Sequence, residues 1–376
     1  MKMKLIYLSN SIIPSRSANS IHVMKMCQGF SDNGYEVILL APNLKNKYEK
    51  NVNDIYDFYG VRKNFKIKKL WYPDFWGGAL FYSLSIFFYL LINKSHKLVY
   101  GRFLYGCYVA AILKKKVILE EHGSMTDTKK HVILIFKTLL KNKYFEKLIV
   151  ISDALKNIYL KKNYLEASKI FVAHDGADKV LDLETTVNLF GDKNSLKIGY
   201  VGHLYEGRGV EIIIECAKKL KDMTFHLVGG NSREIEYWPN YLKTLGLKNI
   251  FFYGFITPKE TYKYRNSFDI VLAPYSKKVS VMKVKGNNQL ETSQFMSPLK
   301  IFEYMAHKKP IIASDLPVIR EVLNEKNSIL VEHNNIELWV KSIIKLKDSN
   351  LRNTIASNAI NDFKNYTWKK RASSVI

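Results

Sequence analysis

The chain has few cysteines, few acidic side chains and no uninterrupted apolar run long enough to cross a bilayer. Its three cysteines, Cys27, Cys107 and Cys216, are odd in number and lie far apart among 376 residues. That pattern excludes a disulfide framework and a paired-cysteine metal site, and it is typical of a reducing cytoplasm. There is also no repeat of solenoid period and no low-complexity tract, so a repeat array is excluded.

Two segments bear on export and on membrane insertion. The first residues run from a basic start into the strand-like segment Lys4 to Leu8, without the apolar core and cleavage site of a signal peptide. The most apolar stretch, Phe75 to Ile92, contains Gly77 and Gly78 and falls short of the about 20 residues that a spanning helix needs. We therefore expect a cytoplasmic protein in which this stretch forms a buried or interfacial helix.

Basic charge is what the chain has in excess. Its 58 lysines and arginines outnumber 34 aspartates and glutamates, which gives a net charge of +24. Such an excess attracts anionic partners, namely phosphorylated ligands, an anionic membrane face or nucleic acid. A lysine-rich compositional bias is the alternative source of this charge. Because no recognisable nucleic-acid module accompanies the lysines, we expect no nucleic-acid partner.

The spacing of apolar residues predicts an α/β protein of two doubly wound domains. Length and a hydrophobic content of 47% suffice for two cores. Short runs rich in Ile, Val and Leu alternate with segments of helical spacing, as in parallel βα units. A polar linker is expected between Gly176 and Lys197. The predicted strands are Lys4–Leu8, Glu36–Leu40, Leu98–Tyr100, Val117–Leu119, Lys147–Ile151 and Ile170–Ala173 before the linker, and Lys197–Val201, Thr224–Val228, Ile250–Tyr253, Ile270–Ala273, Pro310–Ala313 and Ser328–Val331 after it.

The most informative segment for chemistry is the predicted helix start at Ser297. Ser297 is a candidate N-cap and Pro298 fits the first helical position. The next amides would then be donors at the positive end of the helix dipole, an arrangement that binds phosphate; they belong to Leu299, Lys300 and Ile301. Glu303 lies about one turn further in, where its carboxylate could accept hydrogen bonds from the two vicinal hydroxyls of a ribose. The alternative is an ordinary exposed glutamate.

A glycine-rich turn follows the first predicted strand of the second half. Gly202 permits close backbone approach, and Arg208 can offer a planar fork to a diphosphate. His203 is a second candidate cation on this turn. The turn matches neither a dinucleotide fingerprint nor a P-loop, so a surface arginine and a solvated histidine remain the alternative.

Together these segments resemble the GT-B glycosyltransferases, in particular their retaining family 4. The resemblance covers nearly the whole chain, through SIIPSRSANSIHV, GYEVILLAP, EEHG, VISDALKNIYL, VAHDGAD, YVGHLYEGRGVE, HLVGG, FYGFI and SPLKIFEYMAHKKPIIASDLPVIREVL. It implies two Rossmann-like domains facing a cleft. Residues 1–190 would form the acceptor side and residues 195–362 the side that holds the nucleotide-sugar donor. Residues 363–376 would cross back as a helix onto the first domain.

The resemblance also implies roles for single residues. Glu303 corresponds to the glutamate that binds the donor ribose, Arg208 to the basic residue on the donor diphosphate, and His122 to the active-site histidine near the donor sugar. His122 follows the apolar run Val117 to Leu119; Arg102, at a similar edge, could meet an acceptor or pair with a neighbouring glutamate. The remaining donor-binding positions are Ala18, Asn19, Gly202, His203, Gly230, Phe255, Ile256, Ser297, Pro298, Leu299 and Lys300.

The chain departs from the family pattern at three places. The first glutamate of the family's pair is replaced by Phe295, so Glu291 or Gln294 is a candidate substitute and the identity of the donor sugar is open. The family's arginine on the glycine-rich turn is His203. The family's N-terminal glycine pair is replaced by the small residues Ala18 and Asn19.

The expected function is transfer of a sugar from a nucleoside diphosphate donor to a hydroxyl of a growing, lipid-linked surface glycan. The resemblance implies retention of configuration without a protein nucleophile, the departing phosphate oxygen taking the acceptor proton. No cofactor or metal is expected, because the sequence shows no Asp-x-Asp motif or histidine-rich cluster. The alternatives are a nucleotide-sugar 2-epimerase of the same fold and a non-enzymatic basic protein that binds nucleic acid or membrane. Peripheral contact with the inner face of an anionic membrane is expected from the apolar stretch Phe75 to Tyr89 and the lysines that follow it.

Overall fold

The computed structural model describes residues 3–46, 49–75, 77–125, 128–279 and 292–376. The chain forms two compact units, Met1–Asp175 with Trp368–Ile376, and Gly176–Thr367. We expected the divisions near residues 190 and 363. They lie at 175 and 367 because the chain beyond Gly176 bonds within the second unit, where the Ala177 amide donates to the Tyr366 carbonyl over 3.0 Å and Ala177 pairs with Thr367 in a parallel bridge.

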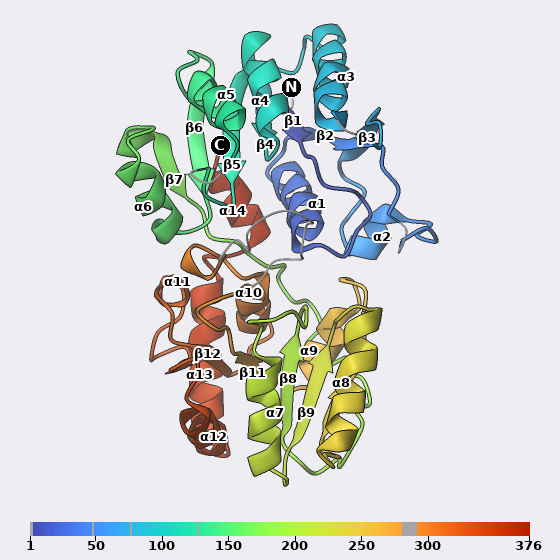
Figure 1. Ribbon diagram of the computed structural model, residues 1–376, viewed down its shortest axis with the longest axis vertical. Helices are drawn as coiled ribbons and strands as arrows, with labels where there is room; N and C mark the ends of the chain where they lie inside the picture. Colours follow the sequence, from blue (N-terminus) through green and yellow to red (C-terminus); the bar gives the residue numbers. More distant parts are fainter. Residues whose placement is uncertain (1–2, 47–48, 76, 126–127, 280–291) are drawn as a thin grey trace. The chain divides into compact units, whose positions relative to one another are not determined.

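The first unit is built on a seven-stranded parallel sheet with the order β3-β2-β1-β4-β5-β6-β7 (Figure 1). The interior strand β1 is buried from Leu5 to Leu8, as expected for a strand with chain packed on both faces. Its neighbours β2 and β4 pair with it in register, so that Tyr7 lies opposite Leu39 and Tyr100. The strands are β1 (Lys4–Leu8), β2 (Glu36–Pro42), β3 (Lys66–Leu70), β4 (Leu98–Gly101), β5 (Lys116–Glu121), β6 (Phe145–Val150) and β7 (Ile170–Val172).

Helices connect these strands, and the C-terminal helix returns to them. The Ser17 side chain caps the first helix by accepting from the Ser20 amide. The last helix packs closely on the first, since a Cβ on Gly29 would lie 2.7 Å from the Trp368 carbonyl oxygen. The helices are α1 (Ala18–Asp32), α2 (Ile55–Tyr59), α3 (Gly78–Ile92), α4 (Leu104–Ile112), α5 (Lys130–Leu140), α6 (Asp153–Lys161), the 3-10 turn η1 (Ala167–Lys169) and α14 (Trp368–Ser374).

The second unit is built on a six-stranded parallel sheet with the order β10-β9-β8-β11-β12-β13. Its core contains the fully buried Trp339, Phe225 and Leu272. The strands are β8 (Lys197–Val201), β9 (Thr224–Val228), β10 (Ile250–Phe252), β11 (Ile270–Ala273), β12 (Ile311–Ser314) and β13 (Ile329–Val331). The helices are α7 (Val210–Lys219), α8 (Ser232–Thr244), α9 (Thr261–Ser267), the 3-10 turn η2 (Thr292–Gln294), α10 (Leu299–Ala306), α11 (Pro317–Arg320), α12 (Ile336–Lys345) and α13 (Ser349–Phe363).

The α/β class and the two doubly wound parallel sheets expected from the sequence are confirmed. One strand, β3, was not expected, because the lysines of its sequence KIKKL hide its period. The apolar stretch expected to be helical forms α3, and its exposed face carries Leu80, Leu84 and Phe88. None of the helices in the described part of the chain has the length and apolar character needed to cross a membrane.

Candidate functional site

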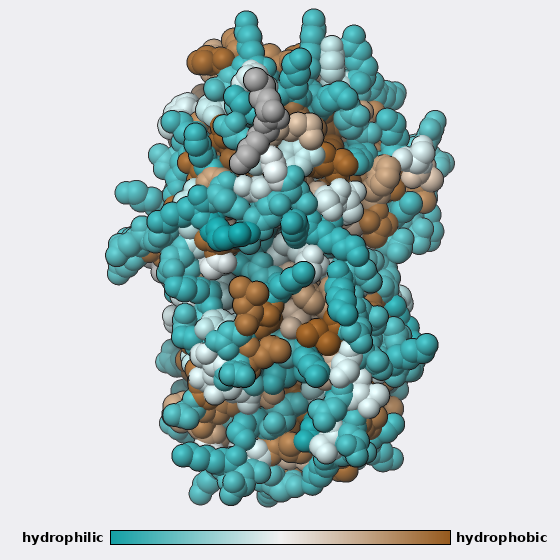
Figure 2. Space-filling model, turned by 180° about the vertical axis from the view of Figure 1, so that it is seen from behind, coloured by the Kyte–Doolittle hydropathy of each residue, from teal (hydrophilic) through white to brown (hydrophobic). Residues whose placement is uncertain are grey.

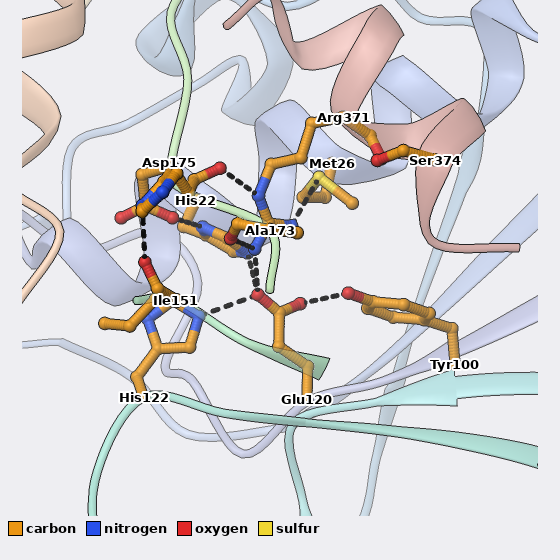
Figure 3. Close-up of polar contacts among 11 residues, drawn as sticks. His22, Met26, Tyr100, Glu120, His122, Ile151, Ala173, Asp175, Arg371 and Ser374 are labelled. Carbon is orange, nitrogen blue, oxygen red and sulfur yellow. Dashed lines mark hydrogen bonds and ion pairs between the residues drawn. The ribbon is translucent and has the colours of Figure 1, made fainter. Parts of the chain in front are cut away.

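A buried carboxylate, Glu120, gathers polar side chains at the carboxyl end of β5 in the first unit (Figure 3). Its Oε1 atom accepts hydrogen bonds from His122 Nε2 and Arg371 Nη2, each over 2.7 Å. Tyr100, on the neighbouring strand β4, donates its hydroxyl to Oε2. The sequence left Arg102 as a candidate to meet an acceptor or to pair with Glu120 or Glu121; in the structure the arginine that pairs with Glu120 is Arg371.

Arg371 reaches this carboxylate from α14, more than 250 positions later in the chain. It also donates to two backbone carbonyls, from Nε to His174 over 2.8 Å and from Nη2 to Ala173 over 3.0 Å, and from Nη1 to Met26 Sδ over 3.2 Å. Burial alone raises the pKa of Glu120, but Arg371 and His22 outweigh it and hold that pKa well below its usual range. Glu120 is therefore ionised at neutral pH, and the buried pair is well supplied with hydrogen bonds.

His122 is a neutral imidazole at neutral pH. Burial, and then repulsion from Arg102, lowers the pKa of His122 to about 3. Because Nε2 lies on a carboxylate oxygen, this nitrogen carries the proton and Nδ1 becomes a hydrogen-bond acceptor. The side chain is 20% exposed, so a ligand hydroxyl can reach it.

A second histidine, His22 of α1, lies beside the first. Its ring meets that of His122 edge-on, with centroids 4.7 Å apart, and its Nδ1 lies 2.9 Å from Asp175 Oδ1. The ligand atoms of His22, His122 and Asp175 lie within 4.8 Å of one another, a grouping that no sequence spacing reveals. His22 Nε2 lies 3.1 Å from Glu120 Oε1. The Arg371 guanidinium already supplies positive charge beside this carboxylate. Independence of metal remains a prediction.

In the second unit, the N-terminus of α10 lies beside β8. The hydroxyl of Tyr304 in α10 accepts from the Val201 amide at the end of β8 over 2.9 Å. We expected Ser297 as the N-cap, but α10 begins at Leu299 with Pro298 as its N-cap and no side-chain cap. The Ile301 amide donates to the Pro298 carbonyl over 3.1 Å, so it is not one of the donors left for a ligand.

Lys300, the second residue of α10, turns its ammonium under the glycine turn that follows β8. Nζ lies 3.5 Å from the centroid of the Tyr200 ring and 5.1 Å from that of Tyr275. A Cβ on Gly202, whose φ is +148°, would come within 2.9 Å of Nζ. Arg208 also lies against the Tyr275 ring, with its Cζ 5.5 Å from the ring centroid. The structure therefore brings Gly202, Arg208 and Lys300 together.

His203 does not add a cation to this group. Burial, followed by repulsion from Arg208 and Lys300, lowers the pKa of His203 to about 4. Its ring stacks on that of Tyr205 at 4.8 Å with 6° between the planes. Where the resemblance implied an arginine, His203 therefore supplies a neutral ring at neutral pH.

Glu303 lies one turn after Lys300 and has an ion-pair partner within the unit. Its Oε2 atom accepts from Arg265 Nη1 of α9 over 3.2 Å, and its side chain is 30% exposed. The arginine fixes one side of the carboxylate while the other side remains accessible. Arg265, like Lys300, was not expected from the sequence as a side-chain contributor, because charged residues are usually exposed.

The other predicted donor positions are distributed between the units. Ala18 and Asn19 begin α1 in the first unit. Gly230, Phe255 and Ile256 follow β9 and β10, at the same edge of the second sheet as the turn after β8. Of the positions considered for the missing glutamate, Phe295 is buried and Gln294 is exposed, whereas Glu291 lies outside the described residues.

Comparison with known proteins agrees with this architecture. Residues 195–349 match the family model described as Glycosyl transferases group 1. An uncharacterized glycosyltransferase of Methanocaldococcus jannaschii is 26% identical over 401 aligned residues, which cover 98% of this chain and 96% of the relative.

Solved structures share the fold along the whole chain. The HepE protein of Anabaena, solved in complex with UDP and glucose, has a TM-score of 0.71 at 16% identity and covers 99% of this chain and 98% of its own. WaaG, a glycosyltransferase involved in lipopolysaccharide biosynthesis, has a TM-score of 0.65 at 12% identity and covers 99% of both chains. The match of residues 195–349 to the group 1 glycosyl transferases, the full-length relative and the shared fold support a glycosyltransferase enzyme built on the GT-B fold.

Proposed function

We propose that the protein transfers a sugar from a nucleoside diphosphate donor to a hydroxyl of a lipid-linked surface glycan, with retention of configuration. The observation that carries the donor class is the group around the N-terminus of α10. There a helix terminus, the Arg208 guanidinium and the Lys300 ammonium face the glycine turn, and Glu303 stands one turn away. A partly buried group of positive side chains at a helix terminus suits a diphosphate.

Each of these groups has a distinct part in the proposed reaction. The Glu303 carboxylate accepts from the ribose hydroxyls, and Arg208 stabilises the charge that grows on the leaving diphosphate as the glycosidic bond breaks. His122 accepts a hydrogen bond from a hydroxyl of the donor sugar through Nδ1. No protein nucleophile is required, because the departing phosphate oxygen takes the proton of the attacking hydroxyl on the same face of the sugar.

The proteins compared above support the proposal in part. HepE was solved with UDP and glucose, which favours a uridine diphosphate donor here, and WaaG is involved in lipopolysaccharide biosynthesis, which favours a surface glycan as acceptor. At these identities the likeness concerns the fold, so the donor and acceptor must come from assays.

A donor panel tests the proposal. Purified protein is incubated with UDP-, GDP-, ADP- and dTDP-sugars, with and without lipid-linked glycan acceptors, and release of nucleoside diphosphate is measured. We expect one donor to release its nucleoside diphosphate only when acceptor is present. We also expect NMR of the product to show the same anomeric configuration, α or β, as in the donor. Release without acceptor together with a 2-epimer would assign the chain to the epimerases instead, and inversion of the anomer would contradict retention.

We also propose that the protein attaches peripherally to an anionic membrane through α3. Exposed apolar side chains recur along this helix at Leu80, Leu84, Phe88 and Ile92, and Figure 2 shows apolar surface at the edge of the first unit that α3 forms in Figure 1. The chain's charge of +24 favours lipid of the opposite sign. An attached enzyme would meet a lipid-linked acceptor at the surface where that acceptor resides.

A further inference from the structure

The side chain of Arg102 lacks partners that a buried arginine normally has. Its Nη1 atom is buried and finds no hydrogen-bond partner among the described residues, and leaving such a donor unpaired away from water is costly. Arg371, by contrast, donates from all three of its guanidinium nitrogens. The Arg102 amide donates to the Leu8 carbonyl over 2.9 Å, which holds the residue where β4 ends. The fold thus keeps this guanidinium at the edge of the sheet without supplying all of its acceptors.

The positive charge of Arg102 is also poorly balanced. Tyr7, Glu121 and His122 all interact with this charge, and Glu121 is the carboxyl among them. Burial raises the pKa of Glu121 to about 8, although attraction to Arg102 opposes the rise. Glu121 is therefore mostly protonated at neutral pH, where it can donate a hydrogen bond instead of neutralising the arginine. These surroundings favour an anion beside Arg102.

The helix that follows Arg102 adds further donors. α4 begins at Leu104 with Phe103 as its N-cap, no described side chain caps it, and its first turn carries no acidic residue. Its first amides therefore remain available as donors at the positive end of the helix dipole. In the loop after β1, the strand that pairs with β4, Ser11 is 5% exposed and its Oγ has no partner among the described residues. A guanidinium, an uncapped helix end and a hydroxyl on neighbouring loops are the donors that an anion requires.

The position of these donors indicates which ligand would supply the anion. Arg102 and His122 follow the neighbouring strands β4 and β5, close enough for the arginine to lower the pKa of the histidine. His122 is the residue proposed to contact the donor sugar, whereas the cations proposed for the donor diphosphate belong to the second unit. An anion at Arg102 would thus lie near the reacting sugar without being the donor diphosphate. The second substrate, the acceptor, is the ligand that meets both conditions.

We propose that Arg102, together with the N-terminus of α4, binds an anionic group of the acceptor, either a phosphate of its lipid linkage or a carboxylate of its sugar. The inference rests on the proposed sugar transfer and adds a requirement for charge on the acceptor. Both groups offer two oxygens to the planar fork of a guanidinium. The enzyme should therefore use an acidic acceptor better than a neutral acceptor built on the same sugar.

Acceptor kinetics of the wild type and of Arg102→Met test the inference. Each of several hexoses is offered as its neutral octyl glycoside, as the octyl glycoside of the matching hexuronic acid, and linked to farnesyl diphosphate. We expect the wild-type kcat/KM to be about ten- to hundredfold higher for one acidic form than for the neutral form, as for a hydrogen bond to a charged group. In Arg102→Met this ratio should fall to near one, and in Arg102→Lys, which keeps the charge without the fork, it should be intermediate. The acidic form that is preferred identifies the source of the anion.

Arg62→Met is the matched control. Arg62 lies in the same unit, pairs with Asp32 and has a side chain that is 69% exposed, so its loss should leave the acceptor ratio unchanged. The affinity for the preferred nucleoside diphosphate, measured by calorimetry, should be the same in Arg102→Met as in the wild type.

The outcomes separate the inference from the proposed function. If the wild type uses neutral and acidic acceptors equally, if Arg102→Met keeps the preference, or if this variant binds the nucleoside diphosphate more weakly, the inference is wrong and the proposed transfer stands. If the wild type transfers sugar to none of the three acceptor forms, both the inference and the proposed function fail.

Discussion

Glu303 is the residue at which recognition of the ribose can be separated from recognition of the phosphates. Replacing it with Gln keeps the size of the side chain but removes the charge that accepts from two hydroxyls. We expect the affinity for the preferred ribonucleoside diphosphate to fall about tenfold or more, equivalent to about 1.5 kcal/mol. Isothermal titration with the matching 2′,3′-dideoxynucleoside diphosphate should show no change, since that ligand lacks both hydroxyls.

Glu260→Gln serves as the control for Glu303→Gln. Glu260 is paired with Lys263 at the start of α9. Its replacement by glutamine should leave the affinities for the ribo and the dideoxy ligands unaltered. If Glu303→Gln loses affinity equally for the ribo and the dideoxy ligands, Glu303 acts through its charge and not through the ribose hydroxyls. If the affinity for the ribo ligand is unchanged, Glu303 does not bind the donor.

Buried histidines should make the fold sensitive to acid. Burial lowers the pKa of His226 to about 4, whereas an unfolded histidine titrates near 6.5. Between these values the unfolded state binds the extra proton, so stability is complete above pH 6.5 and falls as the pH drops toward 4. His226 alone should cost about 2 kcal/mol between pH 6.5 and 5.

His226→Gln tests this pH dependence. His226 contacts Tyr253 and Thr224 at 2.9 Å each, and glutamine can keep polar contacts without titrating. Denaturant unfolding at pH 7 and pH 5 should show a smaller difference for the variant than for the wild type. An identical difference for the two proteins would mean that His226 does not contribute to the acid sensitivity.

At the scale of elements, α14 is held to the first unit by the buried pair of Glu120 and Arg371. Arg371→Met should lower the free energy of unfolding by about 3–5 kcal/mol, because it leaves a buried carboxylate without its cation. The double variant with Glu120→Gln should recover part of that loss. Urea unfolding followed by tryptophan fluorescence, with Trp368 next to His22, measures both. A single variant as stable as the wild type would show that packing alone holds α14.

The apolar face of α3 should decide attachment to lipid. A double change, Leu84→Glu with Phe88→Glu, places negative charge on the face expected to enter the bilayer interface, so sedimentation with anionic liposomes at low salt should drop to background. Leu181→Glu, at the most exposed of the large apolar side chains, controls for the added charge. Attachment through α3 would be contradicted if the wild type sediments equally with neutral and anionic liposomes, or if the double variant still sediments with anionic liposomes.

The elements of this chain differ in how readily the sequence reveals them. β1 and β8 are short, apolar and followed by helices, so their spacing predicts them. β3 was missed because Lys66, Lys68 and Lys69 interrupt its apolar pattern. The start of α10 was placed one residue early, because Ser297 followed by Pro298 is the usual signature of a cap, whereas the structure uses the proline itself.

The site divides in the same way. Arg208 and Glu303 stand in local motifs that indicate chemistry by themselves. The link from Glu120 to Arg371 spans 251 positions, and no local pattern encodes a contact of that separation. The role of Lys300 depends on its burial beneath the glycine turn, which contradicts the usual exposure of lysine and is visible only once the sheet has been assembled.

At the scale of the whole molecule, the second unit is one continuous segment inserted into the first. Its two ends lie together, since Ala177 pairs with Thr367. We therefore expect residues 176–367 to fold when expressed alone and to bind the preferred nucleoside diphosphate within about tenfold of the full chain, because Arg208, Lys300 and Glu303 all lie in this segment. Circular dichroism and titration measure this. A segment that unfolds, or folds without binding, would contradict the prediction.

The adjacency of those two ends also makes the second unit a module that recombination could replace. The two boundaries of the second unit lie next to each other, since a Cβ on Gly176 would lie 2.5 Å from the Tyr366 carbonyl oxygen. A segment from another protein therefore has to match the first unit at one place only. If the second unit holds the donor and the first the acceptor, as the resemblance implies, such an exchange would change the donor and keep the acceptor. Chimeras joined at 175/176 and 367/368 are the proteins in which new donor and acceptor pairings should be sought.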